Sequence, residues 1–527
     1  MQTLSSLLAG KPAGPGARTY ASVNPADLDD VVATVELAGP ETFAEACRQA
    51  REASRRWAAT PAPVRGQVIA NIGRLVGANK RALAALLTRE IGKPAGEALG
   101  EIQEIIDTCD FFLGEGRRLY GQTVPSEMPD KELYTYRKPL GVAAVITAAN
   151  FPAAVPSWYI VPALLCGNTV VWKPAEPAAA VADALAQIFA HAGVPAGVVQ
   201  LVHADGPATF EGLSRALEQG LVDKVGFTGS TEVGRRISAL CGEHLQSPCL
   251  ELGGKNPMVV EPDADLDLAV RGAVFSGFAT AGQRCTSLGT VWVHDSLHDE
   301  FLCRFADAVS ALPIGEPNAE VFYGPLIEPR YLPRFESYLG LVERHHKLHG
   351  STGTGRITAD NPRAGFTGDP AAGLYCHPAV VSGIRPGDAL YSTETFGPLV
   401  GLGRYGSLDE AIELANGHGY GLSAAIYTRD VAAAHRFRRG CRAGMISVNN
   451  STVGAEAHLP FGGNGLSGNG SRQSGQWVID QFTSWQSVNW DYSGVLQRAQ
   501  MDVAEVTVDL GFTLPEAGRP TPAGNGR

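Results

Sequence analysis

The sequence predicts an α/β fold with more than one domain, in which parallel sheets are covered by helices. Its 527 residues are too many for a single core. From Gly141 onward, short apolar runs alternate with amphipathic segments, which is the pattern of parallel strands connected by helices. With 44% apolar and 18% charged residues, the composition is that of an ordinary globular protein.

Helices are expected first along the chain. Apolar residues recur at spacings of three and four over 40–115, which predicts helices. The segment 131–141, "KELYTYRKPLG", alternates aromatic and charged residues, which predicts an exposed strand with an unpaired edge. Buried strands are expected next at 141–148, 167–174, 197–203 and 223–230, with helices at 180–193 and 208–220.

A second α/β series follows. A helix at 266–282, a strand at 286–295 and a helix at 300–312 are expected, and the segments 409–417, 424–428 and 432–440 continue the series. The Gly-rich, polar segment 345–373 is longer than most loops inside a compact domain, which predicts an exposed insertion. The final segment, 515–527, is rich in Pro and Gly and is expected to be disordered.

The bulk properties exclude several classes of protein. The formal net charge of −11 argues against a nucleic-acid binder, which would need a basic face. Nine cysteines, none at CxxC spacing, indicate neither a disulfide framework nor a zinc site, so we expect no metal and a cytoplasmic location. The N-terminus lacks the pattern of a secretion signal. The run 139–172 has no charged residue, but its prolines would break a spanning helix, so no membrane association is expected.

Two turns at the ends of predicted strands suit a nucleotide. In "FTGSTEVG", Gly229 and Ser230 open a helix whose N–H groups and dipole would favour a phosphate, although an ordinary capped turn has the same composition. In "WKPAE", Lys173 and Glu176 follow a strand, where an acidic residue can bind ribose hydroxyls. A solvated ion pair is the alternative for that second turn.

Glu251 and Cys285 are the candidate reactive residues. Glu251 ends an apolar strand in "LELGGKNP", where burial would raise its pKa toward the range of a general base, unless a Lys or Arg pairs with it. Cys285, in "TAGQRCTS", follows a helix, and Arg284 beside it would lower the pKa of the thiol. An isolated free cysteine is more often a small buried apolar residue. One helix separates the two residues, so both can reach one cleft.

Five segments together resemble the NAD(P)-dependent aldehyde dehydrogenase superfamily, in its order and spacing. They are "FTGSTEVG", "ELGGKNP", "GQRCTS", "ETFGPLV" (394–400) and "PFGGNGLSG" (460–468). The resemblance covers the chain apart from its tail. It implies a Rossmann-like cofactor domain (1–124 and 142–252), an α/β catalytic domain (253–449), a small β bridging element for oligomerisation (125–141 and 480–500) and a tail (501–527).

The resemblance also implies roles for individual residues. Cys285 matches the nucleophile, Asn150 the amide that holds the oxyanion, and Glu251 the base that activates water. The implied cofactor is NAD or NADP, with NAD favoured because Glu176 would repel a 2′-phosphate. The matching cofactor residues are Thr147, Ala148, Lys173, Glu176, Gly229, Ser230, Leu252, Glu394 and Phe396.

A narrower resemblance points to the antiquitin-like branch, which oxidises α-aminoadipic semialdehyde. It is carried by "GEIQEIIDTCDFFLG", "TAGQRCTS", "VGAEAHLPFGG" and "VNWDYSGVLQRAQ". In that branch an Arg and the amides of a Gly-Ala loop bind the substrate's carboxylate, and an acidic residue binds its amine. The residues implied to form the substrate site are Glu104, Trp158, Arg284, Thr286, Gly454, Ala455 and Phe461. Arg284 could instead only lower the thiol pKa or pair with a core carboxylate.

The chain departs from the superfamily at two charged positions, which are Tyr159 and Gln473 here. We expect an enzyme that oxidises a small, carboxylate-bearing semialdehyde to an acid and assembles as a homodimer or homotetramer. Uncharged aliphatic or aromatic aldehydes are the alternative substrates. A CoA-acylating enzyme, whose branches usually lack the base that Glu251 matches, and a non-catalytic binding protein are the other hypotheses.

Overall fold

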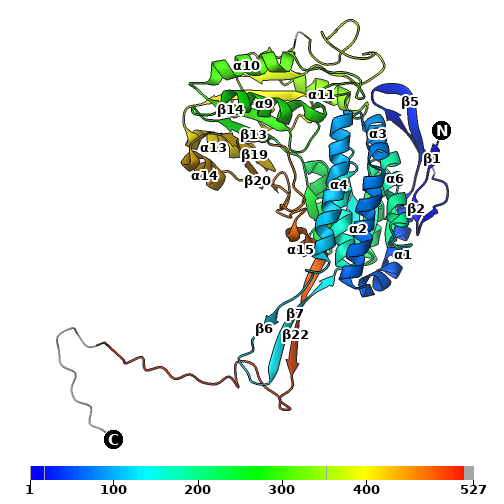
Figure 1. Cartoon of the computed structure of the whole chain (residues 1–527), viewed down its shortest axis with the longest axis vertical. Helices are drawn as coiled ribbons and strands as arrows, with labels where there is room; N and C mark the ends of the chain where they lie inside the picture. Colours follow the sequence, from blue (N-terminus) through cyan, green and yellow to red (C-terminus); the bar gives the residue numbers. More distant parts are fainter. Residues whose placement is uncertain (1, 17, 352, 515–527) are drawn as a thin grey trace. The chain divides into compact units, whose positions relative to one another are not determined.

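The computed structural model describes residues 2–16, 18–351 and 353–514, so the disorder predicted for 515–527 lies outside the described residues (Figure 1). The chain divides into two compact units. One comprises 1–119 and 138–484, and the other comprises 120–137 and 485–527. The larger unit contains two seven-stranded sheets and the candidate site residues.

The first part of the chain forms strands that were not predicted. β4 (Arg18–Asn24) and β5 (Asp27–Leu37) form an antiparallel pair, and β1 (Gln2–Leu4) pairs with β5 in parallel. The helices predicted over 40–115 are confirmed as α1 (Pro40–Ala59), α2 (Ala62–Ala78), α3 (Lys80–Ile91) and α4 (Ala95–Glu115). α2 and α4 pack against each other and form part of a helical layer in the larger unit (Figure 1).

The first large sheet has the order β12-β11-β8-β9-β10-β2-β3. Its strands are β8 (Val142–Ile146), β9 (Thr169–Lys173), β10 (Val199–Leu201), β11 (Lys224–Thr228), β12 (Cys249–Glu251), β2 (Leu7–Leu8) and β3 (Lys11–Pro12). The run from β12 to β10 is parallel, which confirms the four predicted strands. The connecting helices are α5 (Ala154–Cys166), η1 (Glu176–Ala178), α6 (Ala179–His191), α7 (Gly206–Glu218) and α8 (Thr231–Glu243).

The second large sheet has the order β15-β16-β17-β14-β13-β19-β20 and confirms the second α/β series. Its strands are β13 (Asn256–Val260), β14 (Leu288–His294), β15 (Lys347–His349), β16 (Ala379–Ser382), β17 (Leu399–Tyr405), β19 (Ser423–Tyr427) and β20 (Met445–Val448). Its helices are α9 (Leu266–Phe278), η2 (Ala279–Gly282), α10 (His298–Ser310), α11 (Tyr331–Leu339), α12 (Ala389–Ser392), α13 (Leu408–Asn416) and α14 (Val431–Gly440). The remaining elements of the larger unit are β18 (Tyr420–Gly421), β21 (Asn464–Gly465), η3 (Gln476–Val478) and α15 (Ile479–Phe482).

The Gly-rich segment 345–373 is mostly exposed or half-buried, as predicted, but it is not only a loop. It contains β15, which extends the second sheet by pairing antiparallel with β16, and it buries Ile357 completely. Polar and glycine residues dominate its composition, which concealed a short edge strand and the buried residues His346, Ile357 and Arg363.

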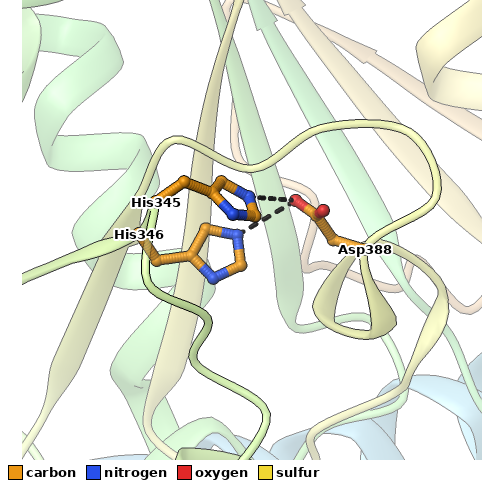
Figure 2. A group of neighbouring side chains, drawn as sticks. All are labelled: His345, His346 and Asp388. Carbon is orange, nitrogen blue, oxygen red and sulfur yellow. Dashed lines mark hydrogen bonds and ion pairs between the residues drawn. The ribbon is translucent and has the colours of Figure 1, made fainter.

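Two histidines at the start of this segment meet Asp388, just before α12 (Figure 2). His346 Nε2 lies 3.0 Å and His345 Nε2 lies 3.3 Å from Asp388 Oδ2. The Glu343 N–H donates to His346 Nδ1 at 2.9 Å, so the proton of a neutral His346 is on Nε2 and is donated to Asp388. A metal ion between these residues would need a free lone pair on His346 Nε2, but that nitrogen carries the proton. The hydrogen-bond pattern therefore favours a structural cluster that holds the insertion against α12.

The smaller unit is a three-stranded sheet of order β22-β7-β6. Its strands are β6 (Thr123–Val124), β7 (Lys131–Pro139) and β22 (Thr483–Asp491). The predicted strand at 131–141 is therefore confirmed, but it is the central strand, and the edges belong to β6 and β22. The sheet leaves large aromatic side chains such as Trp485 and Trp490 exposed.

The charge-free run 139–172 folds as predicted into a strand, a loop, a helix and a strand, namely β8, α5 and β9. Every residue of α5 is buried within the protein. Across the described residues, no helix combines the length and apolar character needed to cross a bilayer.

Candidate active site

The candidate cofactor residues line a cavity of about 420 Å³ at the carboxyl ends of the first sheet's strands. Predicted residues in its wall are Thr147, Ala148, Lys173, Glu176, Gly229 and Ser230. They follow β8, β9 and β11, and parallel strands bring their carboxyl ends to one edge of a sheet. Sequence positions more than 80 residues apart therefore share one wall.

The turns "FTGSTEVG" and "WKPAE" line this cavity, and each also has the structural role that was the alternative to ligand binding. Ser230 is the N-cap of α8, and its Oγ accepts from the Val233 N–H at 3.4 Å. Lys173 Nζ lies 3.2 Å from Glu176 Oε2. The capped turn and the ion pair are thus present, and the same atoms are available to a ligand in the cavity.

A smaller cavity of about 90 Å³ holds the predicted reactive centre. Cys285 and Asn150 line it, together with the remaining predicted cofactor residues, Leu252, Glu394 and Phe396. Ala148, Gly229 and Ser230 line both cavities, so the two spaces adjoin. The structure thus places the candidate nucleophile next to the candidate nucleotide site.

A left-handed turn directs the chain from α9 to Cys285. Thr280, Ala281 and Gly282 all have positive φ angles, of 53°, 51° and 70°. Two of these residues carry a Cβ, for which this conformation is strained, and such strain tends to collect at functional sites. At Gly282 a Cβ would come within 2.2 Å of the Gly397 carbonyl oxygen, so only glycine fits.

The surroundings of Cys285 favour the protonated thiol. Burial raises the pKa of Cys285 to about 12, with further increases from the carboxylates of Glu251 and Glu394. The backbone N–H groups of Thr286 and of Cys285 itself act in the opposite direction. The expectation that Arg284 would lower this pKa was wrong, because its guanidinium turns away from the sulfur toward Glu97.

Asn150 points its amide at the loop that carries Cys285. Its Nδ2 donates to the Gln283 carbonyl at 3.1 Å, and its own carbonyl accepts from Lys93 Nζ at 3.0 Å. Lys93 forms an ion pair with Glu101, and both side chains are fully buried. Glu101 Oε1 in turn accepts the N–H groups that begin α5, at 2.9 and 3.1 Å.

Lys93, Glu101 and Asn256 hold the reactive centre, and sequence reasoning missed all three. Asn256 Nδ2 donates to the carbonyls of Cys285 and Ser287 at 2.8 and 2.7 Å. Its position inside "ELGGKNP" was the available signal for Asn256. For the buried pair there was no signal, because a Lys and a Glu in a helical region read as surface residues.

Glu251 ends β12 and is buried with both carboxyl oxygens lacking a hydrogen-bond partner among the described residues. Burial raises its pKa well above the ordinary value, while Arg472 acts to lower it. Oε1 lies beside Gly462, where a Cβ would come within 2.8 Å of it. The alternative of a Glu251 ion pair is not found within the described chain, which leaves a carboxylate able to accept a proton.

The two departures from the superfamily pattern lie close to this carboxylate. The Tyr159 hydroxyl donates to the Phe227 carbonyl at 3.0 Å, and Glu251 contributes to the raised pKa of Tyr159. Gln473 Nε2 donates to Cys249 Sγ at 3.1 Å. Neutral side chains therefore occupy these two positions, where the superfamily carries charged ones.

The predicted substrate residues are only partly brought together. Glu104, Trp158 and Ala455 line a third cavity, of about 270 Å³, and Phe461 stacks on Trp158 with ring centroids 4.9 Å apart. Burial, reinforced by Glu101, raises the pKa of Glu104 to about 8, and its Oε2 has no partner among the described residues. Asp107, Asp110 and Glu456 line the same cavity, which makes its wall acidic.

Gly454, Arg284 and Thr286 are not among the residues that line this cavity. An Arg284 guanidinium nitrogen lies 2.6 Å from Glu97 Oε2, and Nε donates to Thr280 Oγ1 at 3.0 Å. Of the uses weighed for Arg284, pairing with a carboxylate is the one present in the structure. Thr286 is buried, and its carbonyl accepts from the Thr452 hydroxyl at 2.8 Å.

Comparison with known proteins agrees with this geometry. The model of the aldehyde dehydrogenase family matches residues 13–488. The α-aminoadipic semialdehyde dehydrogenase of Bos taurus is 34% identical over 92% of this chain and 87% of its own length. The α-ketoglutaric semialdehyde dehydrogenase of Bacillus subtilis is 34% identical over 88% and 93%. The solved betaine aldehyde dehydrogenase of Staphylococcus aureus, in complex with NAD+, superposes with a TM-score of 0.86 at 27% identity, covering 93% of this chain and 95% of that one. The chain therefore belongs to the aldehyde dehydrogenase family and is an aldehyde dehydrogenase.

Proposed function

We propose that this enzyme oxidises a small amino-acid-derived semialdehyde, bearing a carboxylate and an amine, to the free acid with NAD. The observation that carries the chemistry is one cavity shared by Cys285, Asn150 and the cofactor residues Glu394 and Phe396. The substrate class is supported by Glu104, which lines the acidic cavity and has a carboxyl oxygen without a partner among the described residues. The Bos taurus and Bacillus subtilis relatives are named for carboxylate-bearing semialdehydes.

In the proposed reaction, the Cys285 thiol first gives its proton to solvent, and the resulting thiolate attacks the aldehyde carbon and forms a thiohemiacetal. The Asn150 amide and the Cys285 N–H stabilise the oxyanion that develops on the former carbonyl oxygen. Bound NAD supplies the acceptor for the hydride, so that a thioester remains on Cys285. Glu251 then takes a proton from water, the hydroxide attacks the thioester carbon, and the C–S bond breaks to release the acid and the thiolate.

The cofactor residues fit a dinucleotide. Lys173 and Glu176 would bind the adenosine ribose, and Ser230 at the start of α8 would bind the diphosphate. At Gly229 a side chain would meet the Phe227 ring at 2.5 Å, so the backbone there stays open to a ligand. Leu252, Glu394 and Phe396 would surround the nicotinamide end, and Glu176 favours NAD over NADP.

Glu104 would bind the substrate's amine, while Trp158 and Phe461 contact its aliphatic chain. The backbone N–H groups of Gly454 and Ala455 have no hydrogen-bond acceptor within the described chain, which suits them to the carboxylate. Arg284 could join them only by leaving Glu97, so its effect on binding would be long-range.

An NADH-release assay with matched aldehydes tests this assignment. Aminosemialdehydes should be oxidised faster than uncharged aliphatic or aromatic aldehydes of the same length. Glu104→Gln should raise KM about tenfold for an α-amino semialdehyde and much less for the α-keto analogue, because only the former loses a charge-assisted hydrogen bond. Faster turnover of the uncharged panel would contradict the substrate class, and acyl-CoA as product would contradict hydrolysis.

We further propose a cytoplasmic homodimer or homotetramer. Among the described residues, β20 and β22 end their sheets with unpaired edges, and β22 exposes Trp485 and Trp490. Pairing such edges between copies would cover them, and light scattering should give a dimer or tetramer at micromolar concentration. Nine free cysteines suit a reducing compartment.

A further inference from the structure

The nucleotide cavity has an arginine in its wall that the proposed cofactor contacts do not use. Arg330 comes from the segment just before α11, far along the chain from Lys173 and Glu176, yet all three line the same space. Cofactor residues on β8, β9 and β11 therefore face a cation contributed by the other half of the large unit.

Arg330 is part of a charged group around Glu176. It forms an ion pair with Glu328, which also accepts from the Tyr20 hydroxyl at 3.4 Å. Burial lowers the pKa of Arg330, but the carboxylate of Glu328, with smaller contributions that include Glu176, more than offsets this and raises it. Glu176 is therefore close enough to Arg330 to act on it directly.

The two ion pairs differ in how firmly they are held. The Lys173 side chain is 7% exposed, whereas the Arg330 side chain is 64% exposed. The Glu328 side chain is only 8% exposed, so this ion pair should persist, but it uses Nε of Arg330, and the terminal nitrogens of the exposed guanidinium can bind a second anion. Its planar fork of donors also matches a phosphate better than an ammonium does.

Glu176 would interact in opposite ways with the 2′-hydroxyl of NAD and the 2′-phosphate of NADP. Glu176 can accept a hydrogen bond from a 2′-hydroxyl but repels a 2′-phosphate. Lys173 and Arg330 lie on the walls beside it and would offset that repulsion if both turned to the phosphate. The balance of these charges, and not Glu176 alone, then determines which dinucleotide binds.

We infer that Arg330 binds the 2′-phosphate of NADP, so that this site accepts NADP as well as NAD. The inference rests on the proposed function, because it takes the cavity at Lys173 and Glu176 to hold the adenosine ribose. If Arg330 were only a surface ion-pair partner of Glu328, its removal would affect both dinucleotides equally.

Equilibrium binding of cofactor fragments to the full-length protein tests the inference without relying on turnover. Isothermal titration with 2′,5′-ADP and with 5′-AMP gives the ratio of two dissociation constants, which differ only through the 2′-phosphate. Arg330→Gln should weaken 2′,5′-ADP relative to 5′-AMP by about five- to tenfold, and Arg330→Lys should restore part of that loss. Glu328→Gln frees the guanidinium and should shift the ratio about threefold in the opposite direction.

Arg344→Gln is the matched control, because it removes the same charge from an exposed position that does not line the cavity. It should leave the ratio unchanged. An unchanged ratio in Arg330→Gln, or a 2′,5′-ADP affinity too weak to measure in the parent protein, would overturn the inference. Failure of both fragments and of NAD to bind would instead contradict the cofactor site and with it the proposed function.

Discussion

Two groups of enclosed carboxylates in this protein differ in whether their oxygens have hydrogen-bond partners. Glu101 and Glu90 are buried with their oxygens satisfied: Lys93 and two backbone N–H groups reach Glu101, and Ser22 and two backbone N–H groups reach Glu90. Glu251 and Glu104 are enclosed with oxygens that have no partner among the described residues. The first group holds α5 and α6 in place, whereas the second lies around the reactive centre and the acidic cavity.

The difference separates structural charges from functional ones. An unpaired buried carboxylate costs free energy, so a fold retains one where a substrate, a water molecule or a proton completes it. Removing a partner from the first group should therefore destabilise the protein. Removing a member of the second group should impair catalysis or binding while the fold persists.

The largest effect is expected at the proposed nucleophile, Cys285. Cys285→Ser should lower NADH production at least about 10³-fold, because a serine hydroxyl is a much weaker acid and nucleophile than a cysteine thiol. Cys303→Ser is the control, since Cys303 is exposed and outside the cavities. Unchanged NADH production in Cys285→Ser would exclude the covalent mechanism.

Breaking the buried pair should cost the most stability. Lys93→Met leaves Glu101 charged and buried, and should lower the free energy of unfolding by about 3–5 kcal/mol in chemical denaturation. The double variant Lys93→Met/Glu101→Leu should recover part of this loss, because no unpaired charge remains. A single variant as stable as the parent would show that the pair does not hold the Asn150 loop.

A smaller effect is expected in the pH dependence of stability. The pKa of Glu104 is about 8 in the folded protein, raised from an ordinary value of 4.5. A raised carboxyl pKa favours the protonated folded state, so the stability it contributes is present below pH 4.5 and is lost as pH rises toward 8. The melting temperature of Glu104→Gln should fall less between pH 4.5 and pH 8 than the melting temperature of the parent protein. Parallel melting curves would contradict the raised pKa.

The sequence was sufficient to predict what depends on local pattern. Alternating apolar runs gave the parallel strands, and the turns after them gave Lys173, Glu176 and Ser230. Glu251 and Cys285 stood out as reactive types beside glycines, and the family resemblance supplied Asn150. All of these are features of a few consecutive residues.

What escaped prediction depends on contacts between distant segments. The Lys93–Glu101 pair serves residues about 50 positions away, and nothing near either residue marks it as buried. The orientation of Arg284 is decided by Glu97, which lies 187 positions earlier. Among the strands before residue 38, β1, β2 and β3 are too short to show an alternating pattern, and the edges of the small sheet depend on which strands pair. Such choices follow from tertiary packing, which overrides local pattern.

The central claim is that the unpaired carboxylates Glu251 and Glu104 are functional and the paired carboxylates Glu101 and Glu90 are structural, and Glu251→Gln tests it most directly. In rapid mixing with aldehyde and NAD, this variant should release about one NADH per active site and then turn over about 10²- to 10³-fold more slowly, because the thioester forms but is not hydrolysed. Its thermal stability should equal or exceed that of the parent, whereas Glu101→Gln should melt well below it. Full steady-state turnover in Glu251→Gln, or a loss of stability matching that of Glu101→Gln, would contradict the claim.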